Sequence, residues 1–203
     1  KAAGVSERDV ILASFPKSGN TWLRYILARA LYPESQINQH NLQHYFPTVY
    51  KNSPEEIKKL SSPRYIKTHA TFFGLYPRCI YMMRDIRAVA VSGWFHAKAK
   101  AKYTGSLSEF IDGPLNKTFG PWHWHVSEAL EHQKLHDDKI LIVRYEDMLA
   151  APLESIQNIL HFTGIKPITT PADIADKTTF RKLQEAETSD GQNPEQLFFR
   201  SGT

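Results

Sequence analysis

Short apolar runs alternate with segments of helical spacing along most of the chain. The first apolar run covers residues 10–15, and a polar segment at residues 16–21 follows it. Apolar residues then recur at the spacing of one helix face, at Trp22, Leu23, Ile26, Leu27 and Ala30. This pattern predicts a strand, a tight turn and a helix.

The same alternation continues downstream. Further strands are predicted over residues 64–67, 78–83 and 140–143, and the last is apolar throughout, as in a buried parallel strand. A loop with at most short helical pieces is predicted over 32–53. Helices are predicted over 54–60, from the cap Asp85 onward, over 119–136, and from Pro152 to Gly164. We therefore expect an α/β fold with three layers, in which helices flank a mostly parallel central sheet.

The turn between the first strand and helix has the residues of an anion-binding loop. A helix N-terminus leaves N–H groups unpaired and favours negative charge. Gly19 lets the backbone approach an anion, Ser18 and Thr21 add hydroxyl groups, and Lys17 adds a positive charge. The ordinary phosphate loop, Gly-x-x-x-x-Gly-Lys-[Ser/Thr], is absent because Lys17 precedes the glycine. A plain turn with a solvated lysine is the alternative.

Four candidate functional residues follow the ends of predicted strands. Lys17, His69, Arg84 and Tyr145 are far apart in sequence, but the carboxyl ends of parallel strands meet at one edge, where ligands bind. A histidine beside cations has a lowered pKa and can act as a neutral base near pH 7. The chain has nine histidines, so a surface role for His69 is the alternative.

Arg84 and Ser92 are spaced to bracket a phosphate. Arg84 follows a strand and Ser92 lies about two helical turns further on, so a planar guanidinium and a hydroxyl can approach one anion. Arg87, between them, fits a solvated charge at a helix start.

Composition narrows the class of ligand. The chain has 203 residues with 41% hydrophobic content, enough for one substantial core, and we expect a single domain over 1–203. Lys and Arg number 25 against 21 Asp and Glu, so bulk charge does not indicate a nucleic-acid partner but suits a small anion.

Cys79 is the only cysteine, which excludes an intrachain disulfide, and its apolar neighbours predict burial. No apolar run has the length of a membrane span and no secretory signal is visible, so we expect a cytoplasmic protein. The chain starts at Lys1, and we expect its C-terminal end to be incomplete.

Several segments together resemble the cytosolic-type sulfotransferases that use 3′-phosphoadenosine 5′-phosphosulfate (PAPS), in a short, bacterial-like form. Residues 15–22 resemble the 5′-phosphosulfate loop of that family. Lys67-Thr68-His69 resembles the catalytic-base segment, which implies His69 as the base and Lys67, with Lys17, as cations near the sulfuryl group. His69 argues against relatives that use a glutamate base. For the loop the resemblance implies cofactor contacts at Lys17, Ser18, Gly19, Asn20, Thr21 and Trp22.

Later segments match the family in the same order. Residues 84–92 resemble the 3′-phosphate segment, although Ala88 stands where an acid is common, which implies lost support for the local backbone. Residues 144–147 imply a nucleotide contact by Tyr145 and structural hydrogen bonds by the carboxylates. Residues 177–180 imply adenine contacts by Thr178 and Phe180. At the end, Arg200 and Gly202 match the last motif, while Ser201 replaces its usual lysine.

The acceptor side is the least defined. Residues 119–126 resemble a segment whose aromatic residues shape the acceptor site, with His123 and His125 as pocket or surface groups. Other aromatic residues fit an apolar acceptor pocket or the core equally well: Tyr45, Phe46, Phe72, Phe73, Trp94, Phe95 and Trp122. We expect a small-molecule or carrier-bound hydroxyl acceptor, with a homodimer as a possibility.

The resemblance implies sulfuryl transfer from PAPS to a hydroxyl group, leaving 3′,5′-ADP, without a metal. Two alternatives stay open. A phosphate-loop kinase would hold Mg²⁺ with Thr21 and Asp147. A nucleotide-sensing or interaction module would keep the fold without the chemistry.

Overall fold

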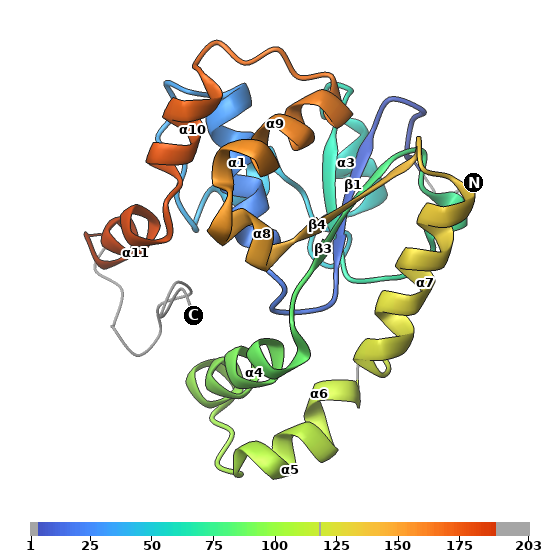
Figure 1. The fold of residues 1–203 in the computed structure, drawn as a ribbon, viewed down its shortest axis with the longest axis vertical. Coiled ribbons are helices and arrows are strands. Elements are labelled where there is room, and N and C mark those ends of the chain that lie inside the picture. The colour runs from blue at the N-terminus through green and yellow to red at the C-terminus, as the bar shows by residue number, and fades with distance from the viewer. Residues whose placement is uncertain (1–3, 118, 190–203) are drawn as a thin grey trace.

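The computed structural model describes residues 4–117 and 119–189, and it is built on one parallel sheet (Figure 1). The strand order is β2-β1-β3-β4, and every pairing in this sheet is parallel. The strands are β1 (Val10–Ser14), β2 (Tyr65–Thr68), β3 (Cys79–Met83) and β4 (Ile140–Arg144). The predicted α/β class is confirmed, and each strand lies within one residue of its predicted bounds.

Helices cover both faces of the sheet because β1 and β3 are buried on both sides. Val10 and Leu12 of β1 pack into one core, and Ile11 and Ala13 pack into the other. The first core is covered by α1 (Asn20–Leu31), α2 (Leu42–Tyr45), α8 (Tyr145–Ala150), α9 (Pro152–Thr163), α10 (Pro171–Lys177) and α11 (Phe180–Ser189). The second is covered by α3 (Pro54–Lys58), the 3-10 helix η1 (Phe73–Leu75) and α7 (Trp122–Leu135). The result is the predicted three-layer arrangement.

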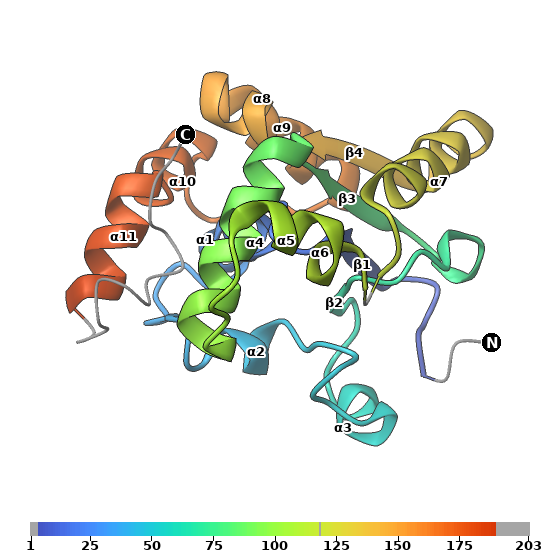
Figure 2. The same cartoon turned by 90° about the horizontal axis from the view of Figure 1, so that it is seen from below.

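The carboxyl ends of the strands all face the same side. Three helices lie beyond that edge, below the sheet in Figure 1 and toward the viewer in Figure 2: α4 (Ile86–Ala101), α5 (Leu107–Asp112) and α6 (Pro114–Lys117). The turns that follow β1, β2, β3 and β4 therefore meet at this edge, and the predicted functional residues come from these turns.

The structure corrects one predicted helix boundary. The helix predicted over 119–136 begins only at Trp122, because Gly120 has a φ of 74° and Pro121 is extended at the N-cap. The predicted loop over 32–53 contains the short helix α2, as expected. Cys79 is 2% exposed, which confirms its predicted burial, and burial raises the pKa of its thiol.

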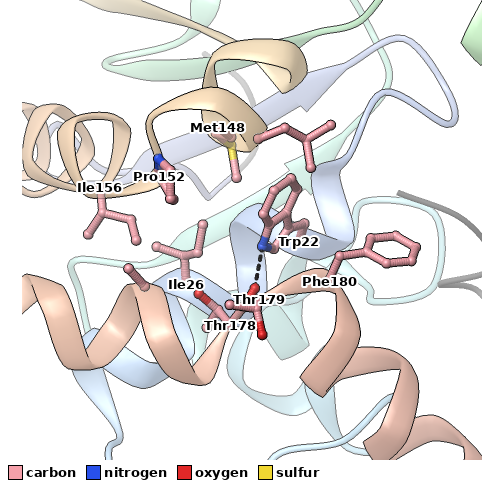
Figure 3. A pocket seen from close by; sticks show the side chains of 10 residues that line it. Trp22, Ile26, Met148, Pro152, Ile156, Thr178, Thr179 and Phe180 are labelled. Carbon is pink, nitrogen blue, oxygen red and sulfur yellow. Dashed lines mark hydrogen bonds between the residues drawn. The ribbon is translucent and has the colours of Figure 1, made fainter. Parts of the chain in front are cut away.

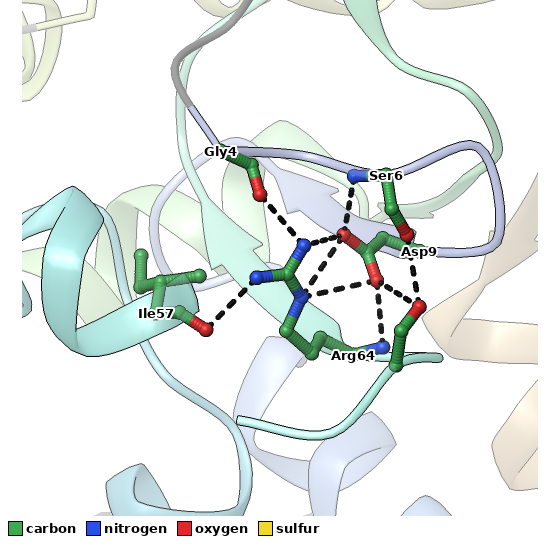
Figure 4. Close-up of polar contacts among 6 residues, drawn as sticks. Gly4, Ser6, Asp9, Ile57 and Arg64 are labelled. Atoms are coloured by element: carbon green, nitrogen blue, oxygen red, sulfur yellow. Dashed lines mark hydrogen bonds and ion pairs between the residues drawn. The ribbon is translucent and has the colours of Figure 1, made fainter. Parts of the chain in front are cut away.

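The opposite edge of the sheet is fixed by a buried ion pair (Figure 4). Asp9 directly precedes β1 and Arg64 directly precedes β2, and their side chains meet at 2.5 Å. Arg64 also donates to the carbonyl oxygens of Ile57 at 2.9 Å and Gly4 at 2.6 Å. This network joins the starts of two strands and α3, away from the candidate site.

Candidate functional site

The turn after β1 requires glycine at its centre. Gly19, the N-cap of α1, has a φ of 99°, in the left-handed region that side chains disfavour. A Cβ atom at this position would lie 2.7 Å from Cδ2 of Tyr145 and 3.1 Å from Cε of Met82. The backbone of the loop is therefore held against Tyr145, with the first N–H groups of α1 at the carboxyl edge.

The predicted loop residues divide into two groups. Asn20 donates to the carbonyl oxygen of Leu12 at 2.9 Å, and the indole of Trp22 donates to that of Thr178 at 2.7 Å. These two side chains secure the loop to the rest of the fold. The hydroxyl of Ser18, by contrast, is buried without a hydrogen-bond partner among the described residues. An unpartnered buried hydroxyl in this turn is available to an anion.

Arg84 stacks over Tyr145 at the end of β3. Its guanidinium carbon lies 3.9 Å from the centre of the Tyr145 ring, and its Nη1 donates to the carbonyl oxygen of Lys17 at 3.3 Å. Its Nε is buried without a partner in the described part of the chain. A rigid, stacked guanidinium with an unused N–H group beside the loop is suited to bind a phosphate.

The start of α4 is supported by two carboxylates. Asp85 accepts from the N–H of Arg87 at 2.8 Å, and Glu146 accepts from the N–H of Asp85 at 2.9 Å. The predicted cap at Asp85 and the structural role of the Glu146 carboxylate are confirmed. Thus the helix start keeps side-chain support despite Ala88. Ser92 lies half-buried further along α4, whereas Arg87 is 88% exposed, as predicted for a solvated charge.

His69 lies directly after β2 with one ring nitrogen fixed. Its Nδ1 is 2.7 Å from the carbonyl oxygen of Ser14, and its backbone N–H donates to the Tyr50 hydroxyl at 2.6 Å. The rings of Tyr50 and Phe119 surround it, with centroids 6.0 and 5.4 Å away. Because a carbonyl oxygen only accepts, Nδ1 carries the proton and Nε2 has the free lone pair.

Burial and nearby cations keep His69 neutral. Burial lowers its pKa to about 3, and Lys67 adds to this effect. The pKa of Lys67 is itself lowered to about 8 by burial and by repulsion from other cations, of which Arg24 contributes most. The ammonium of Lys67 lies 5.4 Å from the centre of the Tyr50 ring. His69 therefore has the protonation state of a general base at neutral pH.

Sequence reasoning missed the role of His125. This residue of α7 is 2% exposed, and its Nε2 donates to the backbone carbonyl of His69 at 3.0 Å. Its Nδ1 accepts from the Tyr81 hydroxyl at 2.7 Å. Tyr81 thus orients His125, and His125 fixes the backbone of His69 by a hydrogen bond. His123, in contrast, is exposed.

The residues predicted to bind adenine meet in one cavity (Figure 3). Trp22, Thr178 and Phe180 line a cavity of ≈ 170 Å³ together with apolar residues of α1, α8 and α9. An apolar cavity of about 150 Å³ admits a benzene ring, so an aromatic ring fits this volume. The hydroxyl of Thr178 already donates to the carbonyl oxygen of Ile174 at 2.7 Å. Thr178 thus supports Trp22 and closes the cavity floor.

The remaining predicted residues separate into core, surface and undescribed positions. Phe46 and Phe73 belong to the core, while Phe72 is 66% exposed. The indole of Trp94 donates to the carbonyl oxygen of Gly105 at 2.9 Å and joins α4 to the start of α5. Arg200 and Gly202 lie outside the described residues.

These groups fit a ligand that carries phosphate and an aromatic base. The loop backbone, the unpartnered atoms of Ser18 and Arg84, and the cavity beside Trp22 lie on the elements nearest the carboxyl edge. Within the described residues, no three His, Cys, Asp or Glu side chains are placed to hold a metal. The fold and site thus define an α/β protein with an anion-binding loop and an adjacent histidine.

Comparison with known proteins gives the family. Residues 7–203 match the family model described as "Sulfotransferase domain", and the chain belongs to this family. It is 28% identical to guinea pig (Cavia porcellus) sulfotransferase 1E1 over 197 residues, covering 87% of this chain and 66% of that protein. It is 29% identical to mouse (Mus musculus) sulfotransferase 1A1 over 201 residues, covering 87% of this chain and 67% of that protein. The chain therefore spans about two thirds of the length of these relatives.

Solved structures agree with the family assignment. The fold matches mouse sulfotransferase SULT7A1 complexed with PAP with a TM-score of 0.74 and 25% identity, covering 98% of this chain and 76% of that one. It matches retinol dehydratase in a complex with retinol and PAP with a TM-score of 0.73 and 20% identity, covering 99% and 75%. Across residues 4–117 and 119–189, no helix combines the length and apolar character needed to cross a membrane.

Proposed function

We propose that the chain transfers a sulfuryl group from PAPS to a hydroxyl group of an acceptor, leaving 3′,5′-ADP (PAP), with His69 as general base. The observation that carries this proposal is the hydrogen bond from Nδ1 of His69 to the carbonyl oxygen of Ser14. It leaves Nε2 as an acceptor on a neutral ring, next to the loop that is suited to the 5′-phosphosulfate. Family membership supports the same reaction.

His69 takes the acceptor's proton on Nε2 as the acceptor oxygen bonds to sulfur. The bond between sulfur and the bridging phosphate oxygen breaks at the same time, and its electron pair stays on the phosphate. Lys17 and the N–H groups at the start of α1 stabilise the charge that grows there. Lys67 adds positive charge near the sulfuryl group. Each of these contributions is strongest in the transition state, because charge develops only then.

The nucleotide contacts of this proposal come from separate elements. Arg84 and Ser92 bind the 3′-phosphate, Ser18 and Thr21 the 5′-phosphosulfate, and Trp22 and Phe180 flank the adenine. The PAP complex of the mouse relative supports this class of ligand. Tyr145 keeps Arg84 oriented by the stacking described above, and Arg200 and Gly202 stay predicted phosphate contacts.

The kinase alternative is disfavoured by the environment of Thr21. The guanidinium of Arg24 donates to the Thr21 hydroxyl at 3.1 Å. In a phosphate-loop kinase this hydroxyl binds Mg²⁺, and a guanidinium at hydrogen-bond distance would repel that ion. We therefore place sulfuryl transfer ahead of phosphoryl transfer.

The aromatic surroundings of His69 favour an acceptor with an apolar part. The rings of Tyr50 and Phe119 lie beside the imidazole ring, with centroids 6.0 and 5.4 Å from its centre. We propose a small-molecule or carrier-bound alcohol as the acceptor class. Homodimerisation and a cytoplasmic location stay predictions.

Calorimetric titration with 3′,5′-ADP tests the donor assignment, with 5′-AMP and ATP as competitors. We expect 3′,5′-ADP to bind at least tenfold more tightly than 5′-AMP, because Arg84 contacts the 3′-phosphate. Arg84→Ala should remove this preference, and Arg87→Ala, which removes an exposed arginine, should retain it. Equal binding of 3′,5′-ADP and 5′-AMP would contradict the donor assignment.

Turnover tests the base. His69→Ala should lower kcat by about 10²- to 10⁴-fold, because a positioned base contributes about that factor. The same variant should bind 3′,5′-ADP like the wild type. Near-normal turnover would contradict the assignment of His69.

A further inference from the structure

Arg24 lies one helical turn into α1 and reaches back toward the anion-binding loop. Its Nη2 donates to the hydroxyl of Thr21 at 3.1 Å. Helical side chains point toward the N-terminus of their helix, which directs Arg24 to the carboxyl edge of the sheet. Its Nε is buried and has no hydrogen-bond partner among the described residues. A guanidinium has five N–H donors, and within residues 4–117 and 119–189 those of Arg24 are bonded only to Thr21.

Lys67 approaches the same region from β2. Its Cα pairs in register with Leu12 of β1, and register partners in a parallel sheet point to the same face. Leu12 packs into the core under α1, so Lys67 lies on the face that carries Arg24. The two cations repel each other enough to lower the pKa of Lys67, after burial as the main cause.

The cations Arg24 and Lys67 have no acidic partner in the part of the chain that the structure describes. The ion pairs found among the described residues involve neither of these cations. They join Asp9 with Arg64, Asp85 with Arg87, Asp176 with Lys182 and Glu185 with Arg181. Burial lowers the pKa of Arg24 to about 10, because the charged form loses solvation there. Partly buried cations without a counter-ion are destabilising, and a bound anion offsets that effect.

The position of Arg24 identifies which part of an anionic ligand it meets. It is bonded to the loop residue Thr21, and it also acts electrostatically on His69 and Lys67. In an in-line transfer the sulfur lies between the leaving phosphate oxygen at the loop and the acceptor oxygen at His69. Arg24 is thus hydrogen-bonded to the loop end of this path, and its charge acts on His69 at the other end.

We propose that Arg24 binds the sulfuryl group of PAPS, with its guanidinium donating to the nonbridging sulfate oxygens between the loop and His69. This inference rests on the proposed function. It assigns to Arg24 a contact that PAPS makes and PAP, which lacks the sulfuryl group, does not. The planar guanidinium matches two sulfate oxygens at once, so it orients the group as well as neutralising it.

Comparison of PAPS and PAP binding tests this assignment without knowledge of the acceptor. The dissociation constants of both nucleotides are measured by calorimetry for the wild type, Arg24→Met, Arg24→Lys and Arg29→Met. Arg24→Met should weaken PAPS binding by about tenfold or more, as for a lost hydrogen bond to a charged group, and change PAP binding less than twofold. The PAPS affinity of Arg24→Lys should lie between that of the wild type and that of Arg24→Met. Lysine keeps the positive charge and the fold but lacks the planar guanidinium. Arg29→Met removes a cation near the end of the same helix, where Arg29 donates to the carbonyl oxygen of Pro33 at 2.9 Å, and should affect neither nucleotide.

Three outcomes overturn the assignment. An equal loss of PAPS and PAP binding in both Arg24 variants would show that Arg24 acts only on the loop, through Thr21. Unchanged PAPS binding in Arg24→Met would place the guanidinium away from the sulfuryl group. A wild-type protein that binds neither nucleotide would overturn the proposed function itself, whereas tight PAP binding with either of the first two outcomes rejects only the role of Arg24.

Discussion

Nδ1 of His69 lies 2.7 Å from the carbonyl oxygen of Ser14, the last residue of β1. A backbone acceptor thus fixes the tautomer of a side chain that follows the neighbouring strand. No ionised carboxylate is needed to orient the imidazole, because the backbone carbonyl accepts from the proton-bearing Nδ1. The parallel pairing of β1 and β2 brings the two residues together, so the fold itself defines the base.

The pH dependence of kcat/KM for PAPS should lack an acid limb near pH 6.5. An unperturbed histidine base is inactivated by protonation as pH falls through its pKa of about 6.5. Burial lowers the pKa of His69 to about 3, so the ring stays neutral and kcat/KM should vary less than twofold from pH 5 to 7. Steady-state kinetics from pH 5 to 7 measures this dependence. A tenfold fall in kcat/KM between pH 7 and 5 would contradict the protonation state assigned to His69.

At alkaline pH, the same dependence of kcat/KM should follow the loss of the proton from Lys67. Burial and repulsion by Arg24 lower its pKa to about 8, so its positive charge is lost as pH rises through that value. We expect kcat/KM for PAPS to decline above pH 8. Lys67→Arg should shift this decline beyond pH 9, because a guanidinium stays protonated there. An identical decline in wild type and Lys67→Arg would assign it to another group.

Gly19→Ala should damage the loop more than its left-handed backbone alone predicts. The new Cβ would lie 2.7 Å from Cδ2 of Tyr145, at a φ of 99°. The strain of a positive φ costs about 1 kcal/mol, and displacement of Tyr145 also disturbs the stacked Arg84. We expect the affinity for 3′,5′-ADP to fall at least tenfold in calorimetric titration.

Gly164→Ala is the matched control for Gly19→Ala. Gly164 has a φ of 70°, and a Cβ there would meet nothing within 4 Å. This substitution should lower the melting temperature slightly and leave the nucleotide affinity unchanged. Equal affinities in the two variants would show that contact between Gly19 and Tyr145 has no role in binding.

The layers of the fold and the loop could be predicted because their signals are local. Strands buried on both faces, such as β1 and β3, need apolar side chains at successive positions, and a turn at a helix start needs glycine and small polar residues. The helix α5 was missed although its signal is also local. Ser106 and Glu109 form a capping box at its start, and this spacing is visible in the sequence.

The contacts that complete the site could not be predicted from local patterns. The indole of Trp22 is bonded to Thr178, 156 residues away, and His125 supports His69 across 56 residues. A buried histidine on a helix has no sequence signature that distinguishes a support of the base from a core residue. In the sequence Arg24 is likewise an ordinary helical arginine. Only the structure places Lys67 on the same face of the sheet.

The buried pair Asp9–Arg64 yields a prediction for stability that is separate from binding. Asp9 is fully buried and accepts from Arg64, from the N–H of Ser6 and from the Ser62 hydroxyl. Burial alone would raise its pKa, but these hydrogen bonds outweigh that effect and lower it to about 2. Asp9→Asn should reduce the free energy of unfolding by about 3 kcal/mol, because it leaves the Arg64 guanidinium buried without its counter-charge. Urea denaturation measures this change, with Glu7→Gln, at an exposed neighbouring carboxylate, as the control.

The sign of the pH effect follows from the lowered pKa. Above the unfolded-state value of about 3.9, Asp9 is ionised in both states and its contribution to stability is complete. As pH falls from about 4 toward 2, the unfolded chain takes up a proton before the folded chain does, so the wild type loses this contribution and Asp9→Asn has none to lose. The difference in stability between the two should therefore shrink in that range. Since the pair lies at the amino ends of β1 and β2, folded Asp9→Asn should bind 3′,5′-ADP like the wild type, and a weakened affinity would show that the two edges of the sheet are coupled.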